Sequence, residues 1–325
     1  MNHPTPSKRA RDLVADSYDL HVHVAPDVMD RRIDDITLAR RFHDEGMAGF
    51  VLKSHYNPTA ERAEAVRKAA RRPAGTASST GGGTGGGTAA PEGADVLGAI
   101  TLNGSVGGMN PVAVEIAARS GARVVWFPTV DASNQRASRA LDPPGAIPPP
   151  WATVQDDLKA HGIEAPAVEV LDDEGNIRSD VTAVLELIAR HNMVLATGHL
   201  SANEILKVTE AASRQGVQRI IITHPEFTSQ RLTAQQQRTL AGYGVFLERC
   251  YNTARTGKVG WDTMIANIRA AGPERSFLSS DLGAPGGPPV EDGLALMTDI
   301  LIEAGFTDEE IRLMAVENTR KLAAP

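Results

Sequence analysis

The feature that most constrains the fold is a regular alternation of short apolar runs with longer helical segments. Runs of strand length occupy residues 18–24, 49–55, 96–102, 123–129, 193–199, 218–224, 244–250 and 276–281. The segments between them carry apolar residues at helical spacing, for example residues 31–43, 180–191 and 202–215. Eight such units in 325 residues predict an α/β fold, a parallel (β/α)8 TIM barrel in one domain spanning residues 1–325. An open doubly wound sheet is the main alternative, but no glycine-rich phosphate-binding motif follows the first run.

Two stretches interrupt this alternation. Residues 73–93 are rich in glycine, threonine and serine, a composition that cannot bury apolar surface and predicts a flexible, disordered insertion after the helix that follows the second strand. Residues 131–178 begin with a proline-rich stretch and end with the hairpin-like run 168–177. We interpret residues 131–178 as an elaborated loop and hairpin after strand four.

Five of the nine histidines lie at the ends of predicted strands. His21 and His23 are two residues apart in the first run, so their side chains point to the same face of a strand. The others are His55, His199 and His224, which end runs two, five and six, and Asp281 ends run eight. The carboxyl ends of barrel strands form the face on which active sites are built. The sequence therefore predicts that these side chains meet.

Imidazole and carboxylate groups together form a ligand set for a divalent metal. Zn²⁺ suits this set best, and Mn²⁺, Ni²⁺ and Fe²⁺ are alternatives. Cys250 is the only cysteine, which excludes both an internal disulfide and a multi-cysteine zinc site. Any metal must therefore be held mainly by His, Asp, Glu or a modified Lys.

The motifs around these residues resemble the amidohydrolase superfamily of metal-dependent hydrolases. They are Asp19-Leu20-His21-Val22-His23, Thr197-Gly198-His199, Thr223-His224-Pro225, Ser279-Ser280-Asp281-Leu282-Gly283 and the Asn318-containing segment 316–322. The resemblance implies that His21, His23 and Asp281 bind a first metal ion, and that His199 and His224 complete that site or carry a second ion. It also implies that Asp281 is the catalytic general base that deprotonates the attacking water.

One departure from the family pattern concerns the bridging ligand. Members with two metals usually carry a carboxylated lysine or a glutamate at the end of strand four, whereas residues 124–129 here contain neither. Lys53 on strand two shares its parity with His55, so a carboxylated Lys53 could bridge two ions from an unusual position. Alternatively, Lys53 stays an ammonium that binds a substrate carboxylate or phosphate. The sequence leaves open whether one or two ions are bound.

Three further residues are candidates for substrate binding. His55 is predicted to contact substrate, with a hydrogen bond to a ligand or direct ligation as alternatives. Glu248 on strand seven could bind substrate, orient a ligand or form a salt bridge with Lys53. Arg136 lies in the long loop after strand four, where it could anchor an anion.

These features predict a hydrolase that uses a metal-activated water to cleave an amide, ester or lactone bond in a small molecule. Phosphoester hydrolysis, deamination, decarboxylation and a non-catalytic metal-binding barrel are the alternatives. The net charge of −7, with scattered basic residues, argues against nucleic acid as a partner. No signal peptide or apolar run of membrane-spanning length is present, so we expect a cytoplasmic protein that binds no membrane. Homo-oligomer formation is left open.

Overall fold

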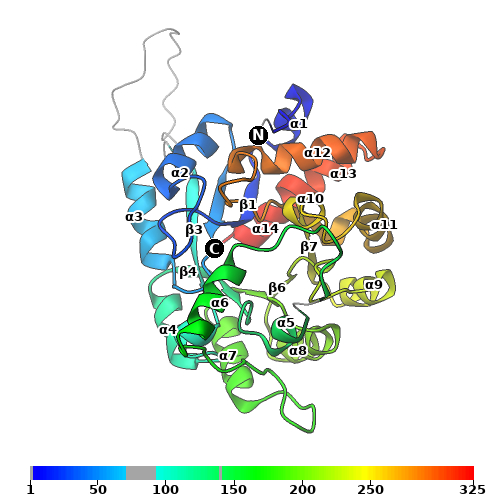
Figure 1. Cartoon of the computed structure of the whole chain (residues 1–325). Coiled ribbons are helices and arrows are strands. Elements are labelled where there is room, and N and C mark those ends of the chain that lie inside the picture. Colours follow the sequence, from blue (N-terminus) through cyan, green and yellow to red (C-terminus); the bar gives the residue numbers. More distant parts are fainter. Residues whose placement is uncertain (1–2, 71–92, 139–140) are drawn as a thin grey trace.

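Eight parallel strands form the centre of the molecule. The computed structural model describes residues 3–70, 93–138 and 141–325. The strands are β1 (Tyr18–Val22), β2 (Gly49–Leu52), β3 (Asp95–Thr101), β4 (Ala122–Trp126), β5 (Val194–Ala196), β6 (Arg219–Ile222), β7 (Phe246–Cys250) and β8 (Ser276–Ser279), and each pairs with the next. The ends of β1 and β8 meet through N–H···O bonds of 2.9 Å from His23 to Leu282 and from Asp281 to His21. The predicted (β/α)8 barrel is confirmed (Figure 1).

One longer helix follows each strand and covers the outside of the barrel. These helices are α2 (Asp35–Asp44), α3 (Ala60–Ala70), α4 (Pro111–Arg119), α7 (Ser179–Arg190), α8 (Ala202–Arg214), α9 (Ala234–Gly242), α11 (Trp261–Ala271) and α12 (Gly293–Glu303). The additional helices are α1 (Lys8–Val14), α5 (Ser133–Ser138), α6 (Trp151–Ala160), α10 (Tyr251–Arg255), α13 (Asp308–Arg312) and α14 (Asn318–Ala323), with single turns η1 (Gly104–Val106), η3 (Pro273–Arg275) and η4 (Val290–Asp292) and a π-helical turn η5 (Leu313–Glu317). Among the described residues, no helix is long and apolar enough to cross a membrane.

Apolar side chains fill the barrel below the strand ends. Leu20, Val51, Trp126 and Phe277 point inward and are almost fully buried, and Leu322 of α14 joins the same cluster. The side-chain amide of Asn318 at the start of α14 donates to the backbone oxygens of Ser276 (2.8 Å) and Pro273 (3.1 Å), which ties this last helix to β8. The barrel is therefore packed beneath its mouth, and the buried histidines lie at the carboxyl ends of the strands.

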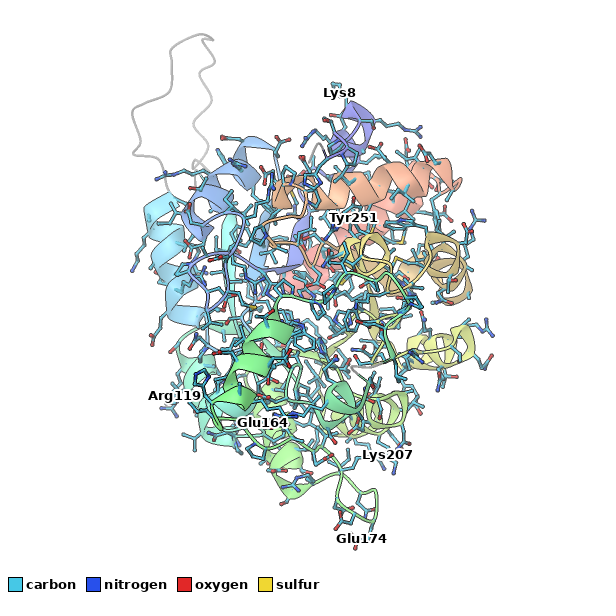
Figure 2. The ribbon with its side chains drawn as sticks, viewed as in Figure 1. Lys8, Arg119, Glu164, Glu174, Lys207 and Tyr251 are labelled. Carbon is cyan, nitrogen blue, oxygen red and sulfur yellow. The ribbon has the colours of Figure 1, made fainter. Side chains whose placement is uncertain are left out.

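The two stretches that interrupt the alternation of strands and helices differ in how much of them the structure describes. The predicted insertion at residues 73–93 lies outside the described residues, apart from Gly93. In the segment 131–178, α5 and α6 precede an antiparallel bridge between Leu171 and Ile177. Figure 2 shows Glu174, in the turn between these two residues, projecting away from the barrel, near Lys207 of α8. This turn therefore lies away from the strand ends, whereas α6 lies over them.

Candidate metal centre

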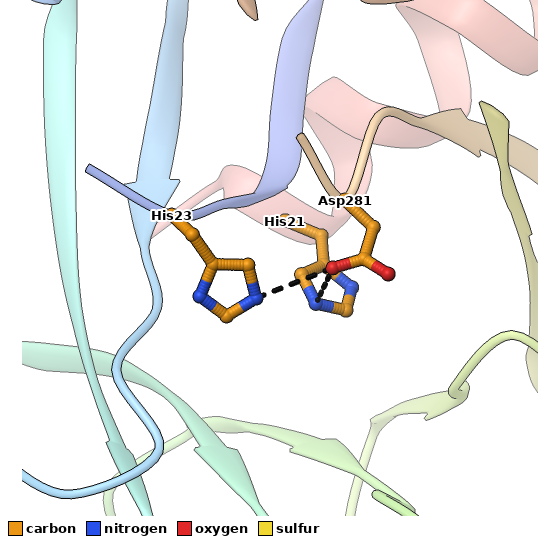
Figure 3. A group of neighbouring side chains, drawn as sticks. All are labelled: His21, His23 and Asp281. Carbon is orange, nitrogen blue, oxygen red and sulfur yellow. Dashed lines mark ion pairs between the residues drawn. The ribbon is translucent and has the colours of Figure 1, made fainter. Parts of the chain in front are cut away.

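Three predicted ligands converge on one point at the carboxyl end of the barrel (Figure 3). Asp281 Oδ1 lies 3.0 Å from His21 Nε2 and 3.2 Å from His23 Nε2. Both imidazoles are buried, and the Asp281 side chain is 17% exposed, so the carboxylate borders the open side of the cluster. His21 and His23 thus each direct their Nε2 atom toward the Asp281 carboxylate. Two imidazole nitrogens and a carboxylate oxygen at these distances are a donor set for a divalent ion.

Backbone contacts between β1 and the segment after β8 set this geometry. Asp19 is fully buried, and its Oδ1 accepts the backbone N–H groups of Ser280 (3.0 Å) and His21 (3.2 Å). Asp281 itself has φ of 52°, in the left-handed region that non-glycine residues rarely adopt. Gly283 (φ 138°) passes so close to β1 that a Cβ there would lie 1.7 Å from the backbone oxygen of His23. Only glycine therefore allows β8 to bring Asp281 against both histidines.

His199 and His224 complete the ring of imidazoles. Their ring centroids are 5.0 Å apart, and the His224 ring is 5.9 Å from that of His21. Gly198 positions His199, since a Cβ at Gly198 would lie 2.3 Å from the backbone oxygen of Phe127. The Nδ1 atoms of both imidazoles are buried and have no hydrogen-bond partner among the described residues. Because buried polar atoms are normally paired, these two nitrogens fit a site that takes a metal ion.

Glu248 lies directly beneath His21 and not in the wall of the pocket. Its Oε1 accepts hydrogen bonds from His21 Nδ1 (3.0 Å) and from the Ser279 hydroxyl (3.0 Å), and its Oε2 accepts the backbone N–H of His224 (3.1 Å). It is 1% exposed. The contacts match one predicted alternative, in which Glu248 orients a ligand, because a carboxylate on Nδ1 leaves Nε2 free to donate an electron pair. Because Glu248 is buried, the structure does not support the predicted contact with substrate. The predicted salt bridge between Glu248 and Lys53 is not formed either.

The pKa of His21 is shifted in the opposite direction to the pKa values of His23 and His224. Burial lowers the pKa of His23 to about 3, with help from Arg31, and lowers that of His224 to about 4. Burial and Lys53 also lower the pKa of His21, but Asp281 and Glu248 outweigh them and raise it to about 9. In a chain without metal, His21 is thus a cation at neutral pH, while His23 and His224 are neutral and ready to act as ligands.

Asp281 has the opposite shift. Burial raises its pKa, but His21 and His23 outweigh that effect and hold it well below its usual value. The carboxylate is therefore ionised at neutral pH, the form that both a metal ligand and a general base require.

Lys53 enters the same cluster from β2. Its Nζ lies 2.8 Å from His21 Nε2 and 5.1 Å from the centroid of the Trp126 ring, and the residue is 3% exposed. Burial lowers the pKa of the Lys53 amine, which favours its neutral form. Lys53 therefore lies where a carboxylated lysine could contact an ion, and its amine is also placed to contact a bound substrate.

The pocket above this cluster is lined by residues from several loops. His55 lies in its wall, with Nδ1 2.9 Å from the Thr129 hydroxyl and its ring 5.0 Å from that of His23. This position is compatible with the predicted substrate contact. Trp151 at the start of α6 crosses the mouth, 6.5 Å from His55 between ring centroids. In Figure 1, α6 lies in front of the strands, consistent with this position.

Arg136 does not reach the pocket. Its guanidinium is bonded to Asp131 (2.9 Å) and to the backbone oxygen of Ala165 (2.7 Å), within the elaborated loop. The prediction that Arg136 anchors an anion in the active site is therefore not supported, because its donors serve the fold of that loop. The pocket is instead lined by four residues that no sequence pattern indicated: Arg31, Trp151, Arg255 and Lys258. Of these four residues, only Arg255 could have been predicted from its place in the sequence, because it follows closely after the end of a strand.

Comparison with known proteins gives a family without an assigned function. Residues 16–248 match the model of a family described as "Family of unknown function (DUF6282)". The chain belongs to this family. The matched region contains His21, His23, His199 and His224 and ends at Glu248, so Asp281 lies beyond it. No curated protein matches the sequence.

Solved structures show what the fold is similar to. The probable dipeptidase PvdM from Pseudomonas aeruginosa superposes with a TM-score of 0.57 at 12% identity, over 97% of this chain and 96% of that one. An amidohydrolase from Pseudomonas aeruginosa superposes with a TM-score of 0.54 at 9% identity, over 96% and 98%. An amidohydrolase from Burkholderia multivorans gives 0.50 at 13% identity, over 96% and 100%. The fold implied by the resemblance to the amidohydrolase superfamily is confirmed.

Proposed function

We propose that this protein is a metal-dependent hydrolase of the amidohydrolase type that cleaves an amide, ester or lactone bond in a small molecule. The observation that carries the proposal is the convergence of His21, His23 and Asp281 at the mouth of the barrel, with the buried, unpartnered Nδ1 atoms of His199 and His224 beside them. The fold shared with amidohydrolases supports it. Zn²⁺ is the proposed ion, because its preferred ligands are histidine nitrogens and carboxylate oxygens.

The residues divide into ligands and supporting groups. His21, His23, His199, His224 and Asp281 would hold the metal. A divalent ion in such a site lowers the pKa of a coordinated water toward about 7 and polarises the scissile carbonyl. The neutral state of His23 and His224 at neutral pH leaves their electron pairs available for this ion.

Asp281 is the proposed catalytic residue for proton transfer. It is ionised, borders the open side of the cluster and is 17% exposed, so a water molecule in the pocket can reach its carboxylate. Asp281 accepts the proton of the attacking water and returns it to the leaving group. Glu248 holds His21 in position from below, and His55 contacts the substrate from the wall of the pocket.

The number of ions follows from the state of Lys53. As a carbamate, Lys53 would supply the bridging carboxylate that β4 lacks, and the site would hold two ions. As an amine, it would leave a single ion and contact the substrate. Elemental analysis of the purified chain distinguishes the two states by giving either two or one zinc per chain.

The proposal is tested by loading the metal-free protein with zinc and screening lactones, amides and esters for hydrolysis. We expect turnover that is lost on chelation and restored by zinc. A protein that binds no transition metal would contradict the proposal. Zinc binding without turnover of any of these classes would favour phosphoester hydrolysis or a non-catalytic metal-binding barrel.

A further inference from the structure

The wall of the pocket contains several basic side chains, although the protein is acidic. Arg31, Lys53, Arg255 and Lys258 all line it, whereas Asp281 is the single carboxylate among its described lining residues. The whole chain has a formal net charge of −7. A cleft lined by one sign of charge raises the local concentration of ligands of the opposite sign. The pocket therefore favours an anion, although the rest of the surface does not.

Two of the four cations are already neutralised by the protein. Arg31 forms an ion pair of 2.6 Å with Asp27, and both side chains are buried. The ammonium of Lys258 is bonded to the Asp142 carboxylate. Side chains paired in this way have little charge left to offer a ligand.

Arg255 at the end of α10 has a different environment. Its Nε and Nη2 donate to the side-chain oxygen of Asn252, at 3.0 and 2.7 Å. An amide oxygen fixes the plane of the guanidinium without neutralising its charge. Among the described residues, no carboxylate lies within ion-pair distance of Arg255, on which Asp281 acts only at longer range, and Nη1 has no hydrogen-bond partner. A partly buried guanidinium in this state has a strong preference for an anionic ligand.

The remaining wall indicates which kind of anion fits. The proline run 148–150, Trp151, Phe227 and Leu282 supply apolar surface around the mouth. A phosphate dianion would need a second unpaired cation from the wall, and Arg31 and Lys258 are both paired with aspartates. A carboxylate has one charge and two oxygens, which match the fork of a single guanidinium.

We propose that Arg255, held by Asn252, binds a carboxylate of the substrate, so that the hydrolase acts on small organic acids with an apolar or planar body. This inference rests on the proposed function, because it concerns the same pocket. Arg255 and the metal centre border one cavity together with Asp281. A carboxylate bound at Arg255 therefore orients the rest of the molecule toward the reacting groups.

The test measures binding, so that it does not depend on finding the substrate. Benzoate, benzamide and inorganic phosphate are titrated into the zinc-loaded, full-length protein by calorimetry. The variants are Arg255→Gln, Arg255→Lys and a matched control, Arg238→Gln. Arg238 is an exposed arginine on α9 that contacts Gln235 and lies outside the pocket. Zinc content is measured for every variant.

We expect benzoate to bind the wild type more tightly than benzamide or phosphate does. Loss of a charge-assisted hydrogen-bonded pair should weaken benzoate binding by about tenfold to a hundredfold in Arg255→Gln. Arg255→Lys should fall between the two, because it keeps the charge and loses the fork, and Arg238→Gln should match the wild type.

Equal benzoate affinities for the wild type and Arg255→Gln would overturn the inference, as would tighter binding of phosphate or benzamide, or no detectable benzoate binding to the wild type. Unchanged zinc content in these cases would leave the proposed hydrolase intact. Failure of the wild type to bind zinc would instead contradict the proposed function itself.

Discussion

Replacement of Glu248 by Gln tests whether the group beneath His21 controls the metal centre. Glu248 accepts three hydrogen bonds, from His21, Ser279 and the backbone of His224, and offers no donor. A glutamine amide keeps one oxygen, which can face His21 and Ser279. Its NH2 group then faces the backbone N–H of His224, which lies 3.1 Å from the present oxygen. One buried donor is left unpaired, and the charge that stabilises His21 is lost.

The magnitude follows from these two effects. Removing the partner of a metal-bound histidine typically weakens metal affinity by about 10-fold to 100-fold, which corresponds to about 1.4–2.7 kcal/mol. The unpaired donor should lower the free energy of unfolding of the metal-free protein by about 1–3 kcal/mol. We therefore expect Glu248→Gln to fold with reduced stability and to bind zinc more weakly.

The assay is competition for zinc against a chromophoric chelator, together with urea unfolding of the metal-free protein. Glu291→Gln is a suitable control, because Glu291 is also largely buried and ion-paired, with Arg41, but lies on η4. The control should lose stability without losing zinc affinity. If Glu248→Gln bound zinc within twofold of the wild type, the Glu248 carboxylate would not tune His21 as a ligand.

Three further outcomes follow from the same geometry. Asp281→Asn should lower turnover by about 10²-fold or more while part of the zinc is retained, because it removes the proton acceptor; unchanged kcat would exclude Asp281 as the base. Zinc affinity should rise about tenfold per pH unit up to about pH 9 and then level off. The reason is that the pKa of His21 is raised to about 9, so below that pH zinc must displace the proton of His21. A zinc affinity that stayed constant between pH 6.5 and 8.5 would refute this expectation. Lys53→Gln should reduce zinc content from two ions to one per chain if Lys53 is a carbamate, and leave a single ion in place if it is an amine, as elemental analysis would show.

Local sequence patterns were sufficient to predict the barrel and the cluster at its mouth. The parity of His21 and His23 in a strand puts both side chains on one face, whatever the rest of the chain does. In a closed parallel barrel every strand ends at the same rim, so His199, His224 and Asp281 are expected to meet without any knowledge of distances. These predictions depend only on the spacing of apolar residues in strands and helices, and on the rule that the strands of a parallel barrel all end at the same rim.

The roles of the surrounding residues depend on contacts that no local pattern contains. Arg136 and Arg255 both follow strand ends, yet Asp131 and Ala165 bind the first, while Asn252 leaves the second free of any carboxylate among the described residues. Glu248 could be placed on strand seven from the sequence, but its bond to His21 required the barrel to close, with β7 and β1 on either side of β8. The sequence alone therefore determined which residues meet in the proposed metal centre, because strand ends follow from local periodicity. Only the tertiary structure decided which charges around it remain available to a ligand, because that depends on how distant loops pair their side chains.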